Sequence, residues 1–160
     1  MKRLSVIMLM ITLLILAPVI VMAVGVGTYT TSYNQTWDST NKARLKVLTV
    51  SITDDTAGTT VALVEADVMS YFLCSMETNP GATAPTDDYD IVINTAGGVD
   101  ILGGAGANRD TANTEIAYPT VDATTGQKAC VPINGALSLV LSGNSVNNAT
   151  TVIKLFLTRP

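Results

Sequence analysis

Apolar and polar residues alternate along several short stretches of the chain. The first is Arg44 to Thr53, where Leu48, Val50 and Ile52 alternate with serine and threonine. A period of two places successive side chains on opposite faces of a β-strand, so this stretch predicts a strand with one buried face. The same pattern predicts further strands over Val61 to Val64, Val68 to Thr78, Ala136 to Ser142 and Thr151 to Thr158.

Two of these predicted strands have assignable faces. In the strand from residue 68 to residue 78, alternation places Phe72, Cys74 and Met76 on one face, with Tyr71 and Leu73 on the other. In the last strand, Ile153, Leu155 and Leu157 lie opposite Val152, Lys154 and Phe156.

A hairpin is predicted between residues 89 and 102. Tyr89, Ile91 and Ile93 alternate with other residues, residues 95–98 have turn chemistry, and residues 99–102 resume a strand. In total the chain has seven or eight short strands, separated by Gly, Pro and Asn, with no amphipathic helix after the N-terminal segment. We therefore expect an all-β fold, an antiparallel two-sheet β-sandwich resembling a jelly roll.

The N-terminal segment has a different pattern. Lys2 and Arg3 precede an apolar run that extends to about Val26, and Val21-Met22-Ala23 suits signal peptidase. Residues 1–23 are therefore predicted to be a hydrophobic helix that serves as a signal peptide. The run is also long enough for an uncleaved membrane anchor, which is the alternative interpretation.

The remaining chain divides into two parts. Residues 24–43 are polar and predict a linker or an extended arm, and residues 44–160 predict the β-domain. The aromatic residues Tyr29, Tyr33 and Trp37 of the arm are candidates for contacts with the domain or with a neighbouring subunit.

The charge of the chain argues against nucleic acid as a partner. Without Lys2 and Arg3, seven basic residues stand against thirteen acidic ones, a formal net charge of −6. The basic residues are scattered singly: Lys42, Arg44, Lys46, Arg109, Lys128, Lys154 and Arg159. Such an acidic surface repels phosphate backbones and offers no basic stripe along which one would bind.

Cys74 and Cys130 are the only cysteines. In an oxidising compartment they form one disulfide that closes a loop of about 57 residues, worth about 4 kcal/mol in the chain-entropy description. The alternative is two buried thiols, because cysteine is often fully buried. Neither alternative makes them catalytic, since the chain has no histidine to act as the base.

The stretch GGVDILGGAGANRD, residues 97–110, has the glycine content of a phosphate-binding loop. A phosphate loop requires a following helix, and residues 107–113 are weak helix formers without a Lys-Ser or Lys-Thr pair. The glycines instead predict two chain reversals that flank a strand.

The acidic residues suggest two further kinds of chemistry. Asp90, Asp100 and Asp110 with Asn94 and Asn108 offer oxygen ligands for Ca²⁺, but they lack the spacing of a calcium loop, so solvated turn carboxylates are the favoured interpretation. No metal or cofactor is therefore expected.

A carboxylate pair for hydrolysis is the second kind. Asp87, Asp88 and Glu115 are its candidates. Without histidine, and with few aromatic residues to line a sugar cleft, we expect no enzyme.

Residues 69–119 resemble a group of small proteins from bacteriophage and prophage structural gene regions. The resemblance rests on the loop NPGATAPTD at 79–87, the strand YDI at 89–91, DILGG at 100–104 and NRD at 108–110. The stretches GALSL at 135–139 and GN at 143–144 are similar as well. It implies a virion-associated β-domain without enzymatic activity. The export leader departs from the pattern, since a particle assembled in the cytoplasm needs none.

Together these observations predict a structural or interaction protein, located outside the cell, on its surface or on a virion. The expected partners are other copies of the chain or a larger protein assembly, with membrane contact only through residues 1–23 if they stay uncleaved. The alternative is a secreted module that binds a cell-envelope glycan through its Gly-rich and Asp-rich loops.

Overall fold

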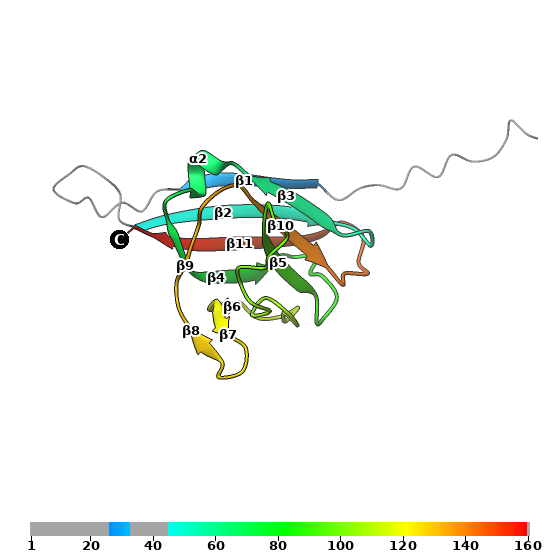
Figure 1. The fold of residues 1–160 in the computed structure, drawn as a ribbon. Coiled ribbons are helices and arrows are strands. Elements are labelled where there is room, and N and C mark those ends of the chain that lie inside the picture. The colour runs from blue at the N-terminus through cyan, green and yellow to red at the C-terminus, as the bar shows by residue number, and fades with distance from the viewer. Residues whose placement is uncertain (1–25, 33–44, 160) are drawn as a thin grey trace, which may run out of the picture.

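The computed structural model of the chain describes residues 26–32 and 45–159, so the predicted leader lies outside the described part. The described residues are mostly β-strands, and the strands form antiparallel sheets that pack together (Figure 1). Within these residues, no helix is long and apolar enough to span a membrane.

The large sheet has six strands. Its order is β1 (Val26–Ser32), β2 (Leu45–Asp54), β11 (Ala149–Thr158), β4 (Phe72–Pro80) and β6 (Glu115–Ala117), and β9 (Val131–Pro132) also pairs with β4. β11 lies at the centre, antiparallel to both β2 and β4. All ten residues of β11 are paired with β2, so the sheet is held by one long continuous ladder.

The small sheet has three strands, in the order β3 (Thr59–Leu63), β10 (Leu137–Ser142) and β5 (Asp90–Thr95). A separate hairpin is formed by β7 (Thr120–Asp122) and β8 (Gln127–Lys128), and the short helix α2 (Glu65–Val68) connects β3 with β4. From β2 to β6, and again from β9 to β11, successive strands alternate between the large and the small sheet. The β7–β8 hairpin between these two segments belongs to neither sheet.

The core lies between the two sheets. The buried faces of β2, β10 and β11 are those that the alternation predicts, so Leu48, Leu139 and Leu155 are fully buried. Together with residues of β3, β4 and β5 they form one cluster of buried side chains. Burial of an aliphatic side chain contributes about 1.5–3 kcal/mol, which makes this shared layer the main favourable contribution to folding.

Strand β4 differs from the prediction. It begins at Phe72 instead of Val68, because α2 precedes it, and Leu73 and Met76 both face the core. The register with β11 shifts at this point, since Phe156 pairs with Ser75 whereas Leu157 pairs with Leu73. A β-bulge of this kind inserts one extra residue and reverses the alternation, which a regular period of two does not reveal.

The predicted strand at residues 99–102 is wrong as well. The chain does reverse after β5, where the Gly98 N–H donates to the Thr95 carbonyl, but residues 101–106 form consecutive turns. The pairing of residues 99–102 with β5 is limited to the Asn94–Asp100 bridge, whose hydrogen bonds run from the Thr95 N–H to the Val99 carbonyl and from the Ile101 N–H to the Ile93 carbonyl. Val26–Ser32, which lies in the predicted linker, pairs along β2 as the strand β1.

A buried polar network joins three loops at one end of the sheets. The Asp54 carboxylate, 1% exposed, accepts hydrogen bonds from the Thr59 hydroxyl (2.5 Å) and from the Asn144 amide (3.0 Å). The Asn144 amide oxygen in turn accepts from the backbone N–H groups of Thr86 and Val146. The side chain of Asn144 therefore connects the end of β2, the β4–β5 loop and the β10–β11 turn.

We expect Asn144→Ala to lower the free energy of unfolding by about 2 kcal/mol, because buried donors and acceptors lose their partners. Urea denaturation of the oxidised chain measures this change. The matched control is Asn147→Ala in the same turn, whose exposed side chain predicts a change below about 0.5 kcal/mol. Equal effects of the two substitutions would contradict a special role for Asn144.

Candidate functional site

The Gly-rich stretch is a cluster of turns organised by one carboxylate. Asp100 accepts hydrogen bonds from the backbone N–H groups of Ile93 (3.3 Å), Leu102 (2.9 Å) and Gly104 (2.8 Å). Residues 103–113 form turns and bends. The stretch therefore lacks the helix N-terminus on which a phosphate loop depends.

Two glycines of this stretch are required by close packing. A side chain at Gly103 would collide with the Thr120 carbonyl, and one at Gly106 would collide with the Ile91 carbonyl. Gly103 also has a φ of 59°, which disfavours other residues. These glycines let the turn cluster lie directly against β5 and β7, which is a structural role.

The candidate calcium ligands do not come together. Asp90 accepts a hydrogen bond from the Asn108 N–H (2.9 Å), whereas Asp110 accepts bonds from the backbone and side chain of Asn113. The Asn113 side chain is the main reason that the pKa of Asp110 lies below its usual value. Among the described residues, no group of three acidic or cysteine side chains is placed to hold a metal.

The candidate hydrolytic carboxylates are likewise engaged in the fold. Asp87 accepts a hydrogen bond from the Thr111 N–H (3.3 Å). Glu115 accepts one from the Asp110 N–H (2.8 Å) and lies 3.6 Å from the guanidinium of Arg109. Asp88 has a φ of 63° and serves as a turn residue. These contacts hold residues 109–111 against the β4–β5 loop and against β6.

Tyr89 places a phenol in the core beside this loop. Its ring is fully buried, and no hydrogen bond of ordinary geometry reaches its hydroxyl or those of Thr78 and Thr151 within the described residues. Burial is the main cause that raises the pKa of Tyr89 above its ordinary value of 10.0. The nearby Thr151 and Thr78 hydroxyls and the charge of Arg109 lower it by less, whereas Glu115 adds to the rise.

A cavity of about 230 Å³ lies between the turn after β5 and the chain that leads into β10. Thr95, Ile101, Ile133, Asn134 and Leu137 are among its lining residues, and none of the lining residues is charged. This volume is below the usual range for ligand pockets, about 300–1,000 Å³. The cavity is therefore smaller than a typical ligand site, and Thr95 and Asn134 provide polar side chains in its lining.

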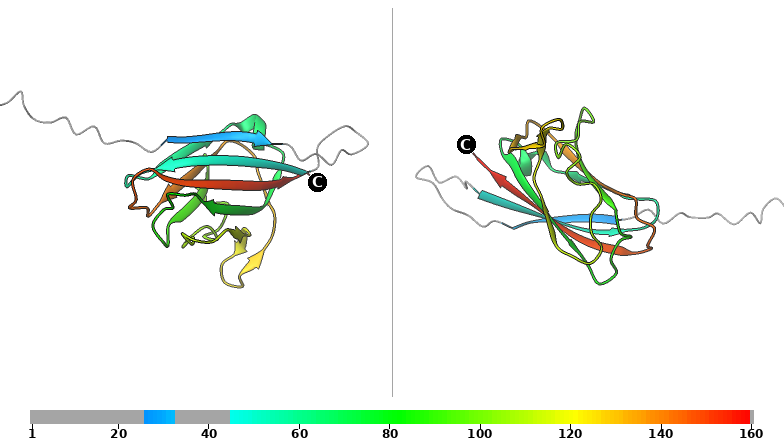
Figure 2. Two further views of the ribbon diagram at one scale, coloured as in Figure 1. Left: turned by 180° about the vertical axis from the view of Figure 1, so that it is seen from behind. Right: turned by 90° about the horizontal axis from the view of Figure 1, so that it is seen from below.

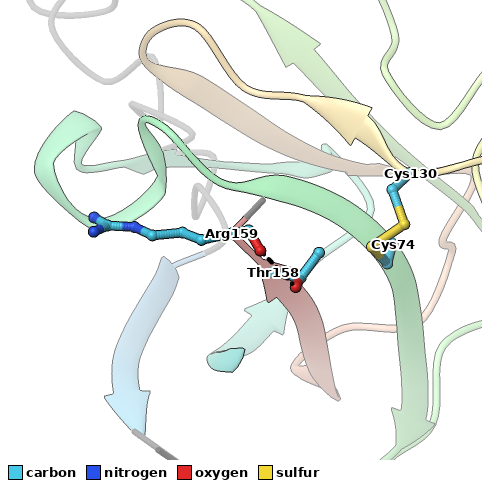
Figure 3. The surroundings of a disulfide bond; sticks show 4 residues. All are labelled: Cys74, Cys130, Thr158 and Arg159. Atoms are coloured by element: carbon cyan, nitrogen blue, oxygen red, sulfur yellow. Dashed lines mark hydrogen bonds between the residues drawn. A yellow bond between two sulfur atoms is a disulfide. The ribbon is translucent and has the colours of Figure 1, made fainter. Parts of the chain in front are cut away.

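Cys74 and Cys130 form a disulfide, which decides between the two interpretations of the cysteines (Figure 3). β9 pairs antiparallel with β4 through Leu73 and Val131. Cys74 follows Leu73 and Cys130 precedes Val131, so the pairing brings the two cysteines together. The bond, with sulfurs 2.04 Å apart, ties the chain after the β7–β8 hairpin to the large sheet. Figure 3 also shows Thr158 and Arg159, at the end of β11, beside this cross-link.

A buried ionic cluster was not foreseen from the sequence. The Lys46 ammonium, on the core side of β2, lies 3.1 Å from the Asp67 carboxylate and also donates to the Asp67 carbonyl (2.6 Å). It lies 5.6 Å from the centre of the Tyr71 ring, and the Arg159 guanidinium lies 4.5 Å from that centre. These contacts fasten α2 to the large sheet. The sequence does contain one indication of this cluster. Lys46 alternates in phase with Leu48, Val50 and Ile52, which predicts that it lies on the buried face of β2.

The aromatic residues of the predicted arm are mostly beyond the described part. Tyr29 lies in β1, where its backbone pairs with Val50. Tyr33 and Trp37 lie outside the described residues.

We expect the double variant Cys74→Ser/Cys130→Ser to unfold more easily by about 2–4 kcal/mol, because the bond joins residues 56 apart in sequence and restricts the unfolded chain. Urea denaturation measures the loss. The control is a reductant, which should bring the wild-type chain to the stability of the variant and leave the variant unchanged. A wild-type chain that takes up a thiol label without reduction would contradict the bond.

We expect the folded chain to lose stability in alkali partly through Tyr89. Its folded pKa is raised, so its contribution is fully present below pH 10 and is lost as the pH rises through the folded value. Between about pH 9 and about pH 11, Tyr89→Phe should therefore lose less stability than the wild type in urea denaturation. Tyr118→Phe, which alters a tyrosine that is 52% exposed, is the control and should follow the wild type.

Comparisons with protein families, with curated proteins and with solved structures find no match to this chain. A functional proposal for it therefore rests on its residues and its fold.

Proposed function

We propose that this chain is a non-enzymatic structural protein, an exported or virion-surface β-sandwich that associates with itself or decorates a larger assembly. The observation that carries the proposal is that carboxylates in the loops and at strand ends accept hydrogen bonds within the fold. Asp54, Asp100, Asp110 and Glu115 all accept hydrogen bonds that shape the loops or join them. These hydrogen bonds support the proposal because they give the carboxylates a structural role in the fold.

The proposed architecture is a jelly roll. In its support, β2, β11, β4 and β6 are neighbours in one sheet, and β3, β10 and β5 are neighbours in the other. This interleaving of early and late strands is what two nested Greek keys produce. The turn cluster at residues 99–109 lies along the outer edge of β5, where it pairs at Asn94 and Tyr89, and takes the place of an eighth strand. Jelly rolls occur in capsid and lectin domains, an analogy of fold alone.

The proposed location is outside the cytoplasm. The predicted leader and the Cys74–Cys130 disulfide both support it, because disulfides persist in oxidising compartments. The virion remains the proposed destination by resemblance, since jelly-roll domains and phage-type loop motifs are both compatible with a particle component.

The second candidate is a secreted module that binds a cell-envelope glycan. The observation in its favour is Tyr118, which is 52% exposed and comes two residues before β7. Sugar-binding sites use exposed aromatic rings together with polar groups, and loops carry such sites.

We expect the full-length gene, expressed in a host with an oxidising export compartment, to yield a product that self-associates. Sedimentation velocity between about 1 and about 100 μM should show a mass that rises with concentration, and negative-stain microscopy should show particles of uniform shape. A glycan array is the parallel measurement. A monomer at every concentration that binds a defined sugar would replace the first proposal with the second.

A further inference from the structure

The outer face of the large sheet, which is the side opposite the core, carries an unusual set of side chains. Val47 on β2 and Val152 and Phe156 on β11 are half-buried there. Ile116 on β6, the cross-strand partner of Glu77 on β4, is 55% exposed. Seen from behind, in the left view of Figure 2, β1, β2, β11 and β4 lie nearest the viewer and no other described element lies over them.

An ion pair lies in the middle of this face, between Thr49 on β2 and Ile116 on β6. The Lys154 ammonium on β11 lies 2.7 Å from the Glu77 carboxylate on β4, and the two residues are direct cross-strand partners. The side chain of Lys154 is 40% exposed and that of Glu77 is 19% exposed. Both charges are therefore available to a partner that approaches this face.

The outer face of the small sheet provides an internal comparison. Its corresponding positions carry Thr60, Ala62, Asp90, Val92, Asn94, Ser138, Val140 and Ser142, none of which is aromatic. Polar and small residues are usual at solvent-facing strand positions. The outer face of the large sheet adds a phenylalanine and an exposed isoleucine, and this apolar area suits an interface.

We propose that the outer face of the large sheet binds the same face of a second copy of this chain. The inference rests on the proposed self-association and specifies the surface that performs it. The two-fold axis of this dimer runs parallel to the strands, midway between the large sheets of the two copies and between β11 and β4. It brings β11 of each copy opposite β4 of the other. Lys154 of each copy then faces Glu77 of the other, so the face is complementary to itself in charge.

The same axis matches the shapes of the side chains. Phe156 and Ser75 are cross-strand partners, so in the dimer the large ring of each copy faces the small serine of the other. Val47, which pairs with Phe156 from the β2 side, faces the chain that follows β6. Large side chains therefore meet small ones at the centre of the interface.

The size of the face suits a weak but specific dimer. Strands β2, β11, β4 and β6 have 10, 10, 9 and 3 residues, and at about 4.8 Å between strands they cover roughly 520 Å². Two copies would then bury roughly 1,000 Å², which is at the lower limit for a specific interface. The net charge of −6 without the leader repels copies elsewhere, whereas the central pair on this face is neutral in sum.

The test exchanges the two charges between copies. We expect Lys154→Glu and Glu77→Lys, each alone, to raise the dissociation constant of the self-association by about tenfold or more, because like charges then face each other. An equimolar mixture of the two variants should associate again, since the carboxylate introduced by the first substitution then faces the ammonium introduced by the second. An intramolecular role of the ion pair would not produce this rescue. Sedimentation velocity of the exported full-length product measures all four samples.

The matched control is Lys128→Glu on β8, an exposed charge reversal outside the large sheet, which should associate like the wild type. Circular dichroism and the intact disulfide verify that each variant is folded. If a reversal prevents folding, Lys154→Gln and Glu77→Gln replace it, and both should weaken association and reduce its dependence on salt.

The outcomes that would contradict the proposal are distinguishable. A wild-type chain that self-associates while both reversals associate equally well overturns this interface and leaves the proposed function in place. The same holds if each reversal weakens association but their mixture does not restore it. A wild-type chain that stays monomeric at about 100 μM and forms no assembly overturns both.

Discussion

The antiparallel pairing of β11 with both β2 and β4 is the interaction on which the rest of the structure depends. It brings the C-terminal strand between two strands from the first half of the chain, so the large sheet exists only when the whole domain has folded. Its register places Leu155 in the core beside Leu48 and Met76, and it places Lys154 on the outside beside Glu77. One ladder thus sets both the packing of the core and the charge pattern of the surface. Contacts so distant in sequence are slow to form, and a disulfide between distant residues favours the same closed arrangement.

The strands that the sequence predicts well are those whose pairing is regular. Leu48, Val50 and Ile52 in β2 and Leu137, Leu139 and Leu141 in β10 follow the period of two because their partners are also regular. The prediction fails where the pairing is irregular. In β4 a bulge opposite Phe156 turns both Leu73 and Met76 inward, and bulges arise from the partner strand as much as from the bulged one. At residues 99–102, the carboxylate of Asp100 attracts three backbone N–H groups and replaces a strand with turns.

The sequence identified candidate residues of the site but not the contacts that they make. The two cysteines were identified, but the choice between a bond and two thiols needed the pairing of β9 with β4, which brings them side by side. The roles of Asp100, Asp110 and Glu115 depend on backbone N–H groups whose positions no residue pattern specifies. Lys46 and Asn144 are polar residues that are buried because their partners, Asp67 and Asp54, come from other segments. Polar burial of this kind is a tertiary property, since an unpaired group would make it unfavourable.

The two faces of the large sheet have different roles: the inner face packs in the core, and the outer face is the proposed interface. On the inner face, aliphatic side chains exclude water and every buried strand position serves stability. On the outer face, stability alone would be satisfied by residues such as the threonine, serines and valines of the small sheet, yet Phe156 and Ile116 lie there around a charge pair. Exposed apolar area is unfavourable in water and increases the risk of non-specific aggregation. A central ion pair restricts that risk, because only a partner with the opposite arrangement of charges satisfies it after desolvation. The outer face therefore combines apolar contact area with a selective element, and a second copy in two-fold orientation supplies both.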